Sequence, residues 1–274
     1  MIPFDYHSHH CRCGHAAGTM REYVESAGAH GLTTLGVSDH APAYWVTGVD
    51  HAYPPTQMAV SALPGYVAEA RELQTEYVGR VAVRVGIEAD FIPEAVPELA
   101  TLLAASRFDY VLGSVHYVRG RSVFDRARWR EEPAEPVFRE YYRLVIAAAQ
   151  TGLFDILAHL SVVEAYAPPM PPDLADELYP EVAAAVAQSG CAVEINTSGY
   201  RKMGGDEPFP NRRVLRELAR HGVPLTFGSD SHAPDFVGWG RDRVEKLLAE
   251  AGVSVAEPVQ IATGREPIWA YRTA

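Results

Sequence analysis

"DYHSHHCRCGH", residues Asp5 to His15, carries four of the chain's 11 histidines and two of its three cysteines. It follows a short apolar run at the start of the chain, which we expect to be a β-strand. Alternate residues of a strand point the same way, so His7 and His9 can face one ion. Neutral imidazole suits zinc, iron, nickel and copper. The stretch therefore predicts a metal site at the end of the first strand.

The composition limits the partners of this 274-residue chain. A formal net charge of -11 provides no basic face for nucleic acid or for an anionic membrane. It leaves room for a small anionic substrate, because bound divalent cations would invert the local field. The start of the chain shows no signal-peptide pattern, and no apolar run is long enough to span a bilayer. We therefore expect a cytoplasmic protein that binds neither nucleic acid nor membranes.

The three cysteines are too few for a disulfide framework. Cys11 and Cys13 lack the C-x-x-C spacing that structural zinc sites usually have, so we expect them to belong to a loop rather than to bind metal. Cys191 opens an apolar run and is a predicted core residue.

Strand-like and helix-like stretches alternate from end to end. Seven short apolar runs, rich in β-branched or aromatic residues, are predicted strands. They are "PFDYH", "LTTLGVSDH", "VAVRVGIEAD", "FDYVLGSVH", "FDILAHL", "CAVEIN" and "VPLTFGSD". The helices predicted between them cover residues 19–31, 65–77, 94–105, 136–150, 173–188, 211–221 and 241–251. In the first helix, Thr19 and Glu22 form a predicted capping box and Gly31 is a predicted left-handed C-cap.

This alternation predicts one α/β domain over residues 1–274, because no low-complexity linker divides it. Seven strand–helix units favour closure into a barrel, and a doubly wound open sheet is the alternative that periodicity leaves open. Residues 51–57 and 118–136 are long insertions after strands, where barrel enzymes keep their substrate loops.

Histidines and carboxylates gather where the predicted strands end. The residues at these ends are His7, His9, Asp39, His40, Glu88, His116, His159, Glu194, Asn196, Asp230 and His232. The carboxyl ends of the strands of a parallel barrel open on one face, and so many ionisable groups would be costly there without cations. The pattern therefore predicts a cluster of ions bridged by at least one carboxylate. His10, His30, His51 and His221 fall elsewhere and are expected to be solvated or capping residues.

These motifs resemble the PHP (polymerase and histidinol phosphatase) superfamily of metal-dependent phosphoesterases, and within it the bacterial histidinol-phosphate phosphatases. The resemblance covers nearly the whole chain. It is carried by "DYHSH" with His15 following, "VSDH", "GIEAD", "GSVHYV", "AHL", "EINTSGYRK" and "FGSDSH".

The resemblance implies a distorted seven-stranded (β/α)7 barrel, similar to a TIM barrel, that holds three divalent ions of zinc, iron or manganese. It assigns the ligands of one ion to His7, His9, Glu88 and Asp230. A second ion would share Glu88 and add His116 and His159. A third would be held by His15, His40 and His232.

The activity implied is hydrolysis of L-histidinol phosphate in histidine biosynthesis. A metal-bridging hydroxide would attack phosphorus directly, since the Asp-x-Asp-x-Thr stretch of aspartyl-nucleophile phosphatases is absent. Asp230 and His232 are the candidate catalytic residues, and either Asp230 or a metal-bound water would protonate the leaving alkoxide. The candidate substrate-binding residues are Arg201 and Lys202, as a phosphate clamp, with Arg119 and Tyr117 in addition.

Other functions stay open. A PHP phosphoesterase of broader specificity would act on other phosphomonoesters or nucleotides, and a nuclease would need a basic stripe that the sequence lacks. Amidohydrolase barrels also begin with His-x-His, but they commonly bridge their ions with a modified lysine at a strand end in the middle of the barrel. The strand ends there carry Glu88, His116 and His159 instead. A non-catalytic metal-binding module is the remaining alternative.

Overall fold

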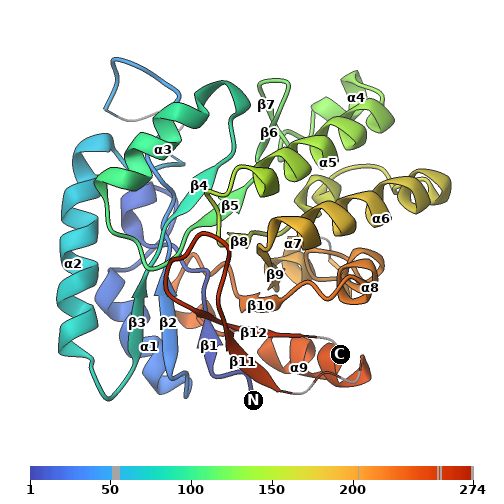
Figure 1. The fold of residues 1–274 in the computed structure, drawn as a ribbon. Helices are drawn as coiled ribbons and strands as arrows, with labels where there is room; N and C mark the ends of the chain where they lie inside the picture. Colours follow the sequence, from blue (N-terminus) through green and yellow to red (C-terminus); the bar gives the residue numbers. More distant parts are fainter. Residues whose placement is uncertain (51–55, 203, 252, 254, 273–274) are drawn as a thin grey trace. The chain divides into compact units, whose positions relative to one another are not determined.

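The structure, a computed structural model, describes residues 1–50, 56–202, 204–251, 253 and 255–272. Helices and strands alternate along the chain (Figure 1), which confirms the predicted α/β class. The strands are β1 (Phe4–Asp5), β2 (Thr34–Val37), β3 (Ala82–Val85), β4 (Glu88–Asp90), β5 (Leu112–Ser114), β6 (Tyr117–Val118), β7 (Arg121–Ser122), β8 (Ile156–Leu157), β9 (Ala192–Asn196), β10 (Leu225–Gly228), β11 (Ala256–Val259) and β12 (Ile268–Tyr271). The α-helices are α1 (Met20–Ala29), α2 (Leu63–Glu76), α3 (Val96–Ala105), α4 (Arg128–Glu131), α5 (Ala134–Gln150), α6 (Pro172–Ser189), α7 (Ser198–Lys202), α8 (Arg212–Arg220) and α9 (Arg241–Glu250). Short 3₁₀ turns are η1 (Cys11–Cys13), η2 (Val60–Ala62), η3 (Pro93–Ala95), η4 (Val162–Ala165) and η5 (Pro234–Phe236).

The chain divides into two compact units. The first unit comprises Met1–Ala89, Glu94–Leu112 and Phe227–Ala251, and the second comprises Asp90–Pro93, Gly113–Thr226 and Gly252–Ala274. One sheet has the order β1-β2-β3 and another the order β11-β12-β10-β9-β8-β5-β4, while β6 and β7 pair with each other. The prediction of one domain over residues 1–274 stays a prediction.

The first unit contains a parallel sheet in which β2 lies between β1 and β3 (Figure 1). Helix α1 packs against β2, and α2 packs against β3. On the other side of β1, the Tyr6 backbone N–H donates to the Phe227 carbonyl (3.0 Å), and Ser8 forms a parallel bridge with Ser231. The first strand and its continuation are therefore paired on both sides, and their side chains are buried, as the apolar sequence predicts.

Two glycines in this sheet allow a tyrosine to cross it. The Tyr110 hydroxyl donates to the Tyr6 carbonyl (2.6 Å), and Tyr110 is fully buried. A Cβ atom added at Gly36 would lie 2.1 Å from the Tyr110 hydroxyl oxygen, and one at Gly86 would lie 2.3 Å from its ring. Only glycine leaves room for this close approach, which links β1, β2 and β3 through one side chain.

Helix α1 begins as predicted, and its C-cap lies one residue before the predicted one. The Thr19 hydroxyl accepts from the Glu22 N–H, and the Glu22 carboxylate accepts from the Thr19 N–H, which completes the capping box. His30 is the C-cap, and Gly31 follows it with a φ of 73°, in the left-handed region where glycine is favoured.

The second unit contains elements that the sequence analysis does not predict. Strand β8 pairs with β9 in parallel, as expected, but β11 and β12 form an antiparallel hairpin, and β12 pairs antiparallel with β10.

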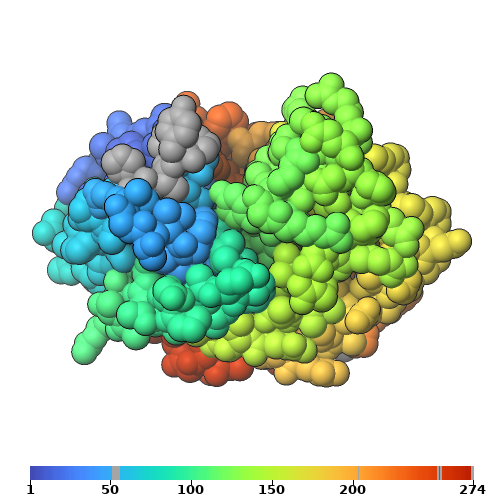
Figure 2. All heavy atoms as spheres, turned by 90° about the horizontal axis from the view of Figure 1, so that it is seen from above, coloured from blue at the N-terminus to red at the C-terminus, as the bar shows by residue number. Residues whose placement is uncertain are grey.

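The predicted insertion at residues 118–136 contains α4 and one strand of the β6–β7 hairpin. This region, part of the light green surface in Figure 2, is held by Arg128, whose buried guanidinium donates to the carbonyls of Val118 and Arg121.

Three helices of the second unit meet at Glu164 in η4. Helix α5 packs against α6, and α6 against α8. The Glu164 carboxylate accepts from the hydroxyls of Tyr142 (2.6 Å) and Tyr179 (2.9 Å) and from the Asn211 side-chain amide (2.9 Å). Cys191 is buried in this unit, as predicted. Among the described residues, no helix has the length and apolar character needed to cross a membrane.

Candidate metal centre

Four side chains of the first unit place their ligand atoms around one point. His7 and His9 follow β1, Glu88 begins β4, and Asp230 follows β10. His7 Nε2 lies 3.4 Å from Glu88 Oε2 and 3.8 Å from Asp230 Oδ1. His9 Nε2 lies 3.5 Å from the same Glu88 oxygen and 3.2 Å from the same Asp230 oxygen. All four residues are buried.

These separations fit a bound cation. An ion with ligand bonds of about 2.1 Å in tetrahedral geometry holds its ligand atoms about 3.4 Å apart. Neither ring nitrogen of the buried His9 makes a hydrogen bond of good geometry with a residue in the described part of the chain. Burial, reinforced by nearby His40, lowers the pKa of His9 to about 3. The ring is therefore neutral at physiological pH, the form that binds metal.

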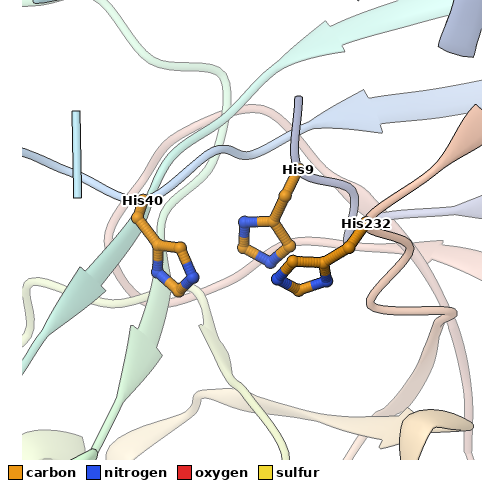
Figure 3. Close-up of side chains that lie close together, drawn as sticks. All are labelled: His9, His40 and His232. Carbon is orange, nitrogen blue, oxygen red and sulfur yellow. The ribbon is translucent and has the colours of Figure 1, made fainter. Parts of the chain in front are cut away.

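A second histidine group lies beside the first. Figure 3 shows His9, His40 and His232 with their rings gathered together, and their ligand atoms lie within 4.8 Å of one another. His232 Nε2 is 3.0 Å from His15 Nε2, and His40 Nδ1 is 2.8 Å from Glu88 Oε2. Burial lowers the pKa of His232 to about 2 and also lowers that of His15. The first unit thus brings together the seven predicted ligands that it contains.

Asp39 is a buried carboxylate next to these histidines that the predicted ligand set omits. It accepts hydrogen bonds from the backbone N–H groups of His40 (2.9 Å) and Cys13 (3.2 Å). Its oxygens lie 3.5 Å from His9 Nδ1 and 3.1 Å from His10 Nδ1. The sequence signal is its place in "VSDH", directly before a predicted ligand. A carboxylate beside the second nitrogen of a ligand histidine orients the ring and fixes its tautomer.

The prediction that His10 is a solvated or capping residue is wrong in part. We expect a solvated or capping residue there, and His10 does cap η1, but its side chain is buried. It packs beside Tyr66, with ring centroids 5.4 Å apart, and burial lowers its pKa to about 4. The close approach of His10 Nδ1 to the Asp39 carboxylate and the packing of its ring on Tyr66 explain why this neutral histidine is kept inside. His30 and His221 are C-caps at exposed helix ends, as expected, and His51 lies outside the described residues.

The second unit holds the two remaining predicted ligands. His116 Nε2 and His159 Nε2 are 3.2 Å apart, and His116 Nδ1 lies 2.9 Å from Asp90 Oδ1. The Glu194 carboxylate accepts from the His159 backbone N–H and from the Asn196 amide, both at 2.9 Å. Asp90 and Glu194 thus support the two histidines, and the predicted ligand set again omits them.

Two of the predicted ligands have unusual backbones. Asp230 has a φ of 51° and His159 a φ of 29°, in the region that L-residues rarely adopt. Such strain persists where the surrounding structure holds it, and it is concentrated at functional sites. At His159 the hydrogen bond from its N–H to Glu194 is part of that support.

The predicted substrate-binding residues lie in the second unit. Arg201 and Lys202 end the short helix α7, which is not among the predicted helices. Lys202 Nζ lies 5.2 Å from the centre of the Phe124 ring. Tyr117 begins β6 and is half-buried. Arg119 is exposed, with a φ of 52°.

Cys11 and Cys13 are the first and last residues of η1. Cys11 is exposed, whereas Cys13 is buried. The groups of potential metal ligands found among the described residues contain His, Asp and Glu side chains. That Cys11 and Cys13 do not bind metal stays a prediction.

This fold, with imidazoles and carboxylates gathered after β1, β2 and β10, defines an α/β protein equipped to bind metal ions. Residues 5–198 match the model of the PHP domain family. The chain therefore belongs to the PHP family, and the predicted resemblance is confirmed.

Relatives match along most of this chain. The probable histidinol-phosphatase of Deinococcus radiodurans is 38% identical over 253 residues, which cover 90% of this chain and 93% of the relative. The histidinol-phosphatase of Bacillus subtilis is 27% identical over 255 residues, which cover 86% of this chain and 95% of that one. The histidinol phosphate phosphatase of Lactococcus lactis, crystallised with zinc, L-histidinol and phosphate, is 24% identical, with a TM-score of 0.80 over 97% of this chain and 98% of that chain. This last likeness shows a shared fold.

Proposed function

We propose that the protein is a metal-dependent phosphomonoesterase that hydrolyses L-histidinol phosphate to L-histidinol and phosphate, a step of histidine biosynthesis. The observation that carries this proposal is the 38% identity to a probable histidinol-phosphatase across 90% of the chain. The gathered ligand atoms of the first unit supply the chemistry that such an activity needs. The cytoplasmic location stays a prediction from the sequence.

Three divalent ions are proposed, of zinc, iron or manganese. His7, His9, Glu88 and Asp230 would hold one ion, which their separations of 3.2 to 3.8 Å support. His15, His40 and His232 would hold another, with support from the 3.0 Å approach of His15 to His232. The family resemblance assigns Glu88, His116 and His159 to the remaining ion, and the paired imidazoles of the second unit support two of these ligands.

Divalent ions bound there would acidify a water molecule and neutralise charge on the phosphate. The chain's own residues have separate tasks. Asp230, whose Oδ1 lies close to both His7 and His9, can hold a proton for the leaving alkoxide. His232 is neutral because burial lowers its pKa, so it can orient a reacting water molecule or hold an ion through a ring nitrogen. Arg201 and Lys202 would bind the phosphate oxygens, with Arg119 and Tyr117 as further substrate contacts.

The finer architecture proposed is the distorted seven-stranded (β/α)7 barrel that the resemblance implies. Within the first unit, β1 pairs with β2 on one side and Tyr6 with Phe227 on the other. This pairing is compatible with a closed barrel, in which every strand has two neighbours, and equally with an inner strand of an open sheet.

One assay on the purified protein tests the function. Metal content is measured by mass spectrometry, and phosphate release is measured for histidinol phosphate, sugar phosphates and nucleotides. We expect strong preference for histidinol phosphate, and loss of activity with a chelator that added zinc, manganese or iron reverses. Equal rates across the panel would replace the proposal by a phosphoesterase of broad specificity. Absence of phosphate release with every metal tested would indicate a non-catalytic metal-binding module.

A further inference from the structure

Two partly exposed aromatic rings lie next to His116 in the second unit. The centre of the Phe124 ring is 5.5 Å from that of His116, and the Tyr166 ring meets Phe124 edge-on at 6.4 Å. Both side chains are only half-buried, whereas the large aromatic side chains of the core are enclosed. Aromatic rings that remain partly open beside a predicted ligand are placed to contact what binds there.

The rings also attract cations. Lys202 Nζ lies 5.2 Å from the centre of the Phe124 ring, and the Arg126 guanidinium lies 4.1 Å from the centre of the Tyr166 ring. Their electron-rich faces therefore point toward positive charge. Lys202, a proposed phosphate contact, is thereby placed on the same aromatic group that flanks His116.

The position of Phe124 is fixed by its neighbours in the chain. The Val123 N–H donates to the His116 carbonyl (2.8 Å), and the Phe124 N–H donates to the Ser122 hydroxyl (3.2 Å). The Asp125 carboxylate then accepts from the Ala127 N–H (2.9 Å). These contacts, which follow the β6–β7 hairpin, hold the Phe124 ring beside His116 rather than leaving it on a free loop.

We infer that Phe124 and Tyr166 form the wall that receives the imidazole ring of the substrate. This inference rests on the proposed function and names its specificity residues. Histidinol phosphate carries its phosphate and its imidazole a few bonds apart, so a group that binds the ring must lie close to the metal ligands. An imidazole has a pKa near 6.5, and aromatic faces bind its neutral form by stacking and its protonated form by cation–π attraction.

The test is the ratio of kcat/KM for histidinol phosphate to that for aminoethyl phosphate, which keeps the phosphate and the amine but has no ring. Phe124→Leu and Tyr166→Leu should each lower this ratio about tenfold, mainly through KM for histidinol phosphate. Phe124→Tyr and Tyr166→Phe retain a ring and should restore most of it. The dissociation constant of L-histidinol, measured by calorimetry on the metal-loaded protein, should rise about tenfold in the two leucine variants.

Two results would overturn the inference. In one, the leucine variants lose activity toward both esters equally, which would mean that the rings only support His116. In the other, they keep the preference and the L-histidinol affinity of the unmodified protein. Failure of the proposed function has a different signature, because the unmodified protein itself would then show no preference for histidinol phosphate.

Discussion

Asp39 is a buried carboxylate that contacts two of the proposed metal ligands without being one of them. It lies 3.5 Å from His9 Nδ1 and accepts the N–H of His40. Asp39→Asn keeps the shape but removes the charge that favours a proton on His9 Nδ1. We expect zinc affinity to fall about 10- to 100-fold, as for other residues that support metal ligands. Competition with a coloured chelator measures it.

A matched control for this prediction is Asp242→Asn, which removes the same charge from an exposed site in the first turn of α9. It should bind zinc as the unmodified protein does. If Asp39→Asn also retained full zinc affinity while its circular dichroism stayed native, Asp39 would be only a structural acceptor for backbone N–H groups.

The predicted ligands and their supporting residues differ in how far the sequence reveals them. His7, His9 and Glu88 could be predicted, because each stands at the end of an apolar run and strand ends converge in this kind of fold. The supporting contacts of Asp90 and Glu194 could not. Glu194 meets the His159 N–H across 35 positions of sequence, and no local pattern records such a contact. The burial of His10 was missed for the same reason.

At the scale of elements, Gly36 in β2 makes the crossing of Tyr110 possible. Gly36→Ala would place a Cβ atom 2.1 Å from the Tyr110 hydroxyl oxygen and 3.0 Å from the Tyr6 backbone. Either the tyrosine leaves its hydrogen bond to Tyr6 or the strands separate. We expect the free energy of unfolding to fall by about 1–3 kcal/mol or more, measured by urea denaturation.

Gly65→Ala is the control for this crowding, because a Cβ atom there meets nothing within 4 Å. Gly65 lies in α2, so its substitution should change the free energy of unfolding by less than about 1 kcal/mol, and in the stabilising direction. A Gly36→Ala variant as stable as Gly65→Ala would show that the sheet adapts to Tyr110 without cost.

Glu164 links η4 to three helices and makes the stability of the second unit depend on pH. Burial raises the pKa of the Glu164 carboxyl above its ordinary value. The folded protein therefore holds a proton that the unfolded chain releases near pH 4.3, and stability falls as pH rises through the folded pKa. Glu164→Gln cannot lose that proton. We expect the stability of the unmodified protein relative to this variant to decrease over the pH range from about 4.3 up through the folded pKa.

Thermal or urea unfolding of both proteins across that range measures the difference. Glu140→Gln provides a comparison, because the Arg143 guanidinium lowers the pKa of Glu140 and the dependence should have the opposite sign. A constant difference between the unmodified protein and Glu164→Gln would mean that the carboxyl titrates alike in both states.

Long helices could be predicted and short elements could not. Apolar residues at helical spacing mark α5 and α6, and the capping box marks the start of α1. The β6–β7 hairpin has only two residues in each strand. It is held by a hydrogen bond from the buried Arg128, a residue whose charge in the sequence is typical of an exposed loop. In β11, buried and exposed residues do not alternate clearly, because Glu257 and Pro258 are both exposed. The sequence pattern therefore does not predict the β11–β12 hairpin, whose strand β12 pairs with β10.

At the scale of the molecule, the order of elements along the chain predicts the α/β class, since alternating strands and helices favour parallel pairing. That pairing is present in β1-β2-β3 and in β8-β9. The antiparallel hairpin at the C-terminal end breaks the alternation, and it follows the last predicted helix, where periodicity gives no signal.

Metal ions should stabilise the first unit as a whole, because the ligands of one proposed ion come from chain segments far apart in sequence. His7 and His9 follow β1, while Asp230 follows β10, and their ligand atoms lie 3.2 and 3.8 Å apart. Drawing these segments together on an ion opposes unfolding. At a free zinc concentration 100 times the dissociation constant, the gain is about 2.7 kcal/mol. Scanning calorimetry of chelated and zinc-loaded protein measures it.

His9→Gln removes a buried ligand and should abolish most of this zinc-dependent gain, whereas His221→Gln, at the exposed end of α8, should keep all of it. The comparison separates binding at the cluster from binding at any surface histidine. Equal stabilisation of the two variants would place the ion elsewhere and would remove the physical basis for assigning His7, His9, Glu88 and Asp230 as its ligands. A gain lost only in His9→Gln would instead tie the stability of the first unit to the site proposed for catalysis.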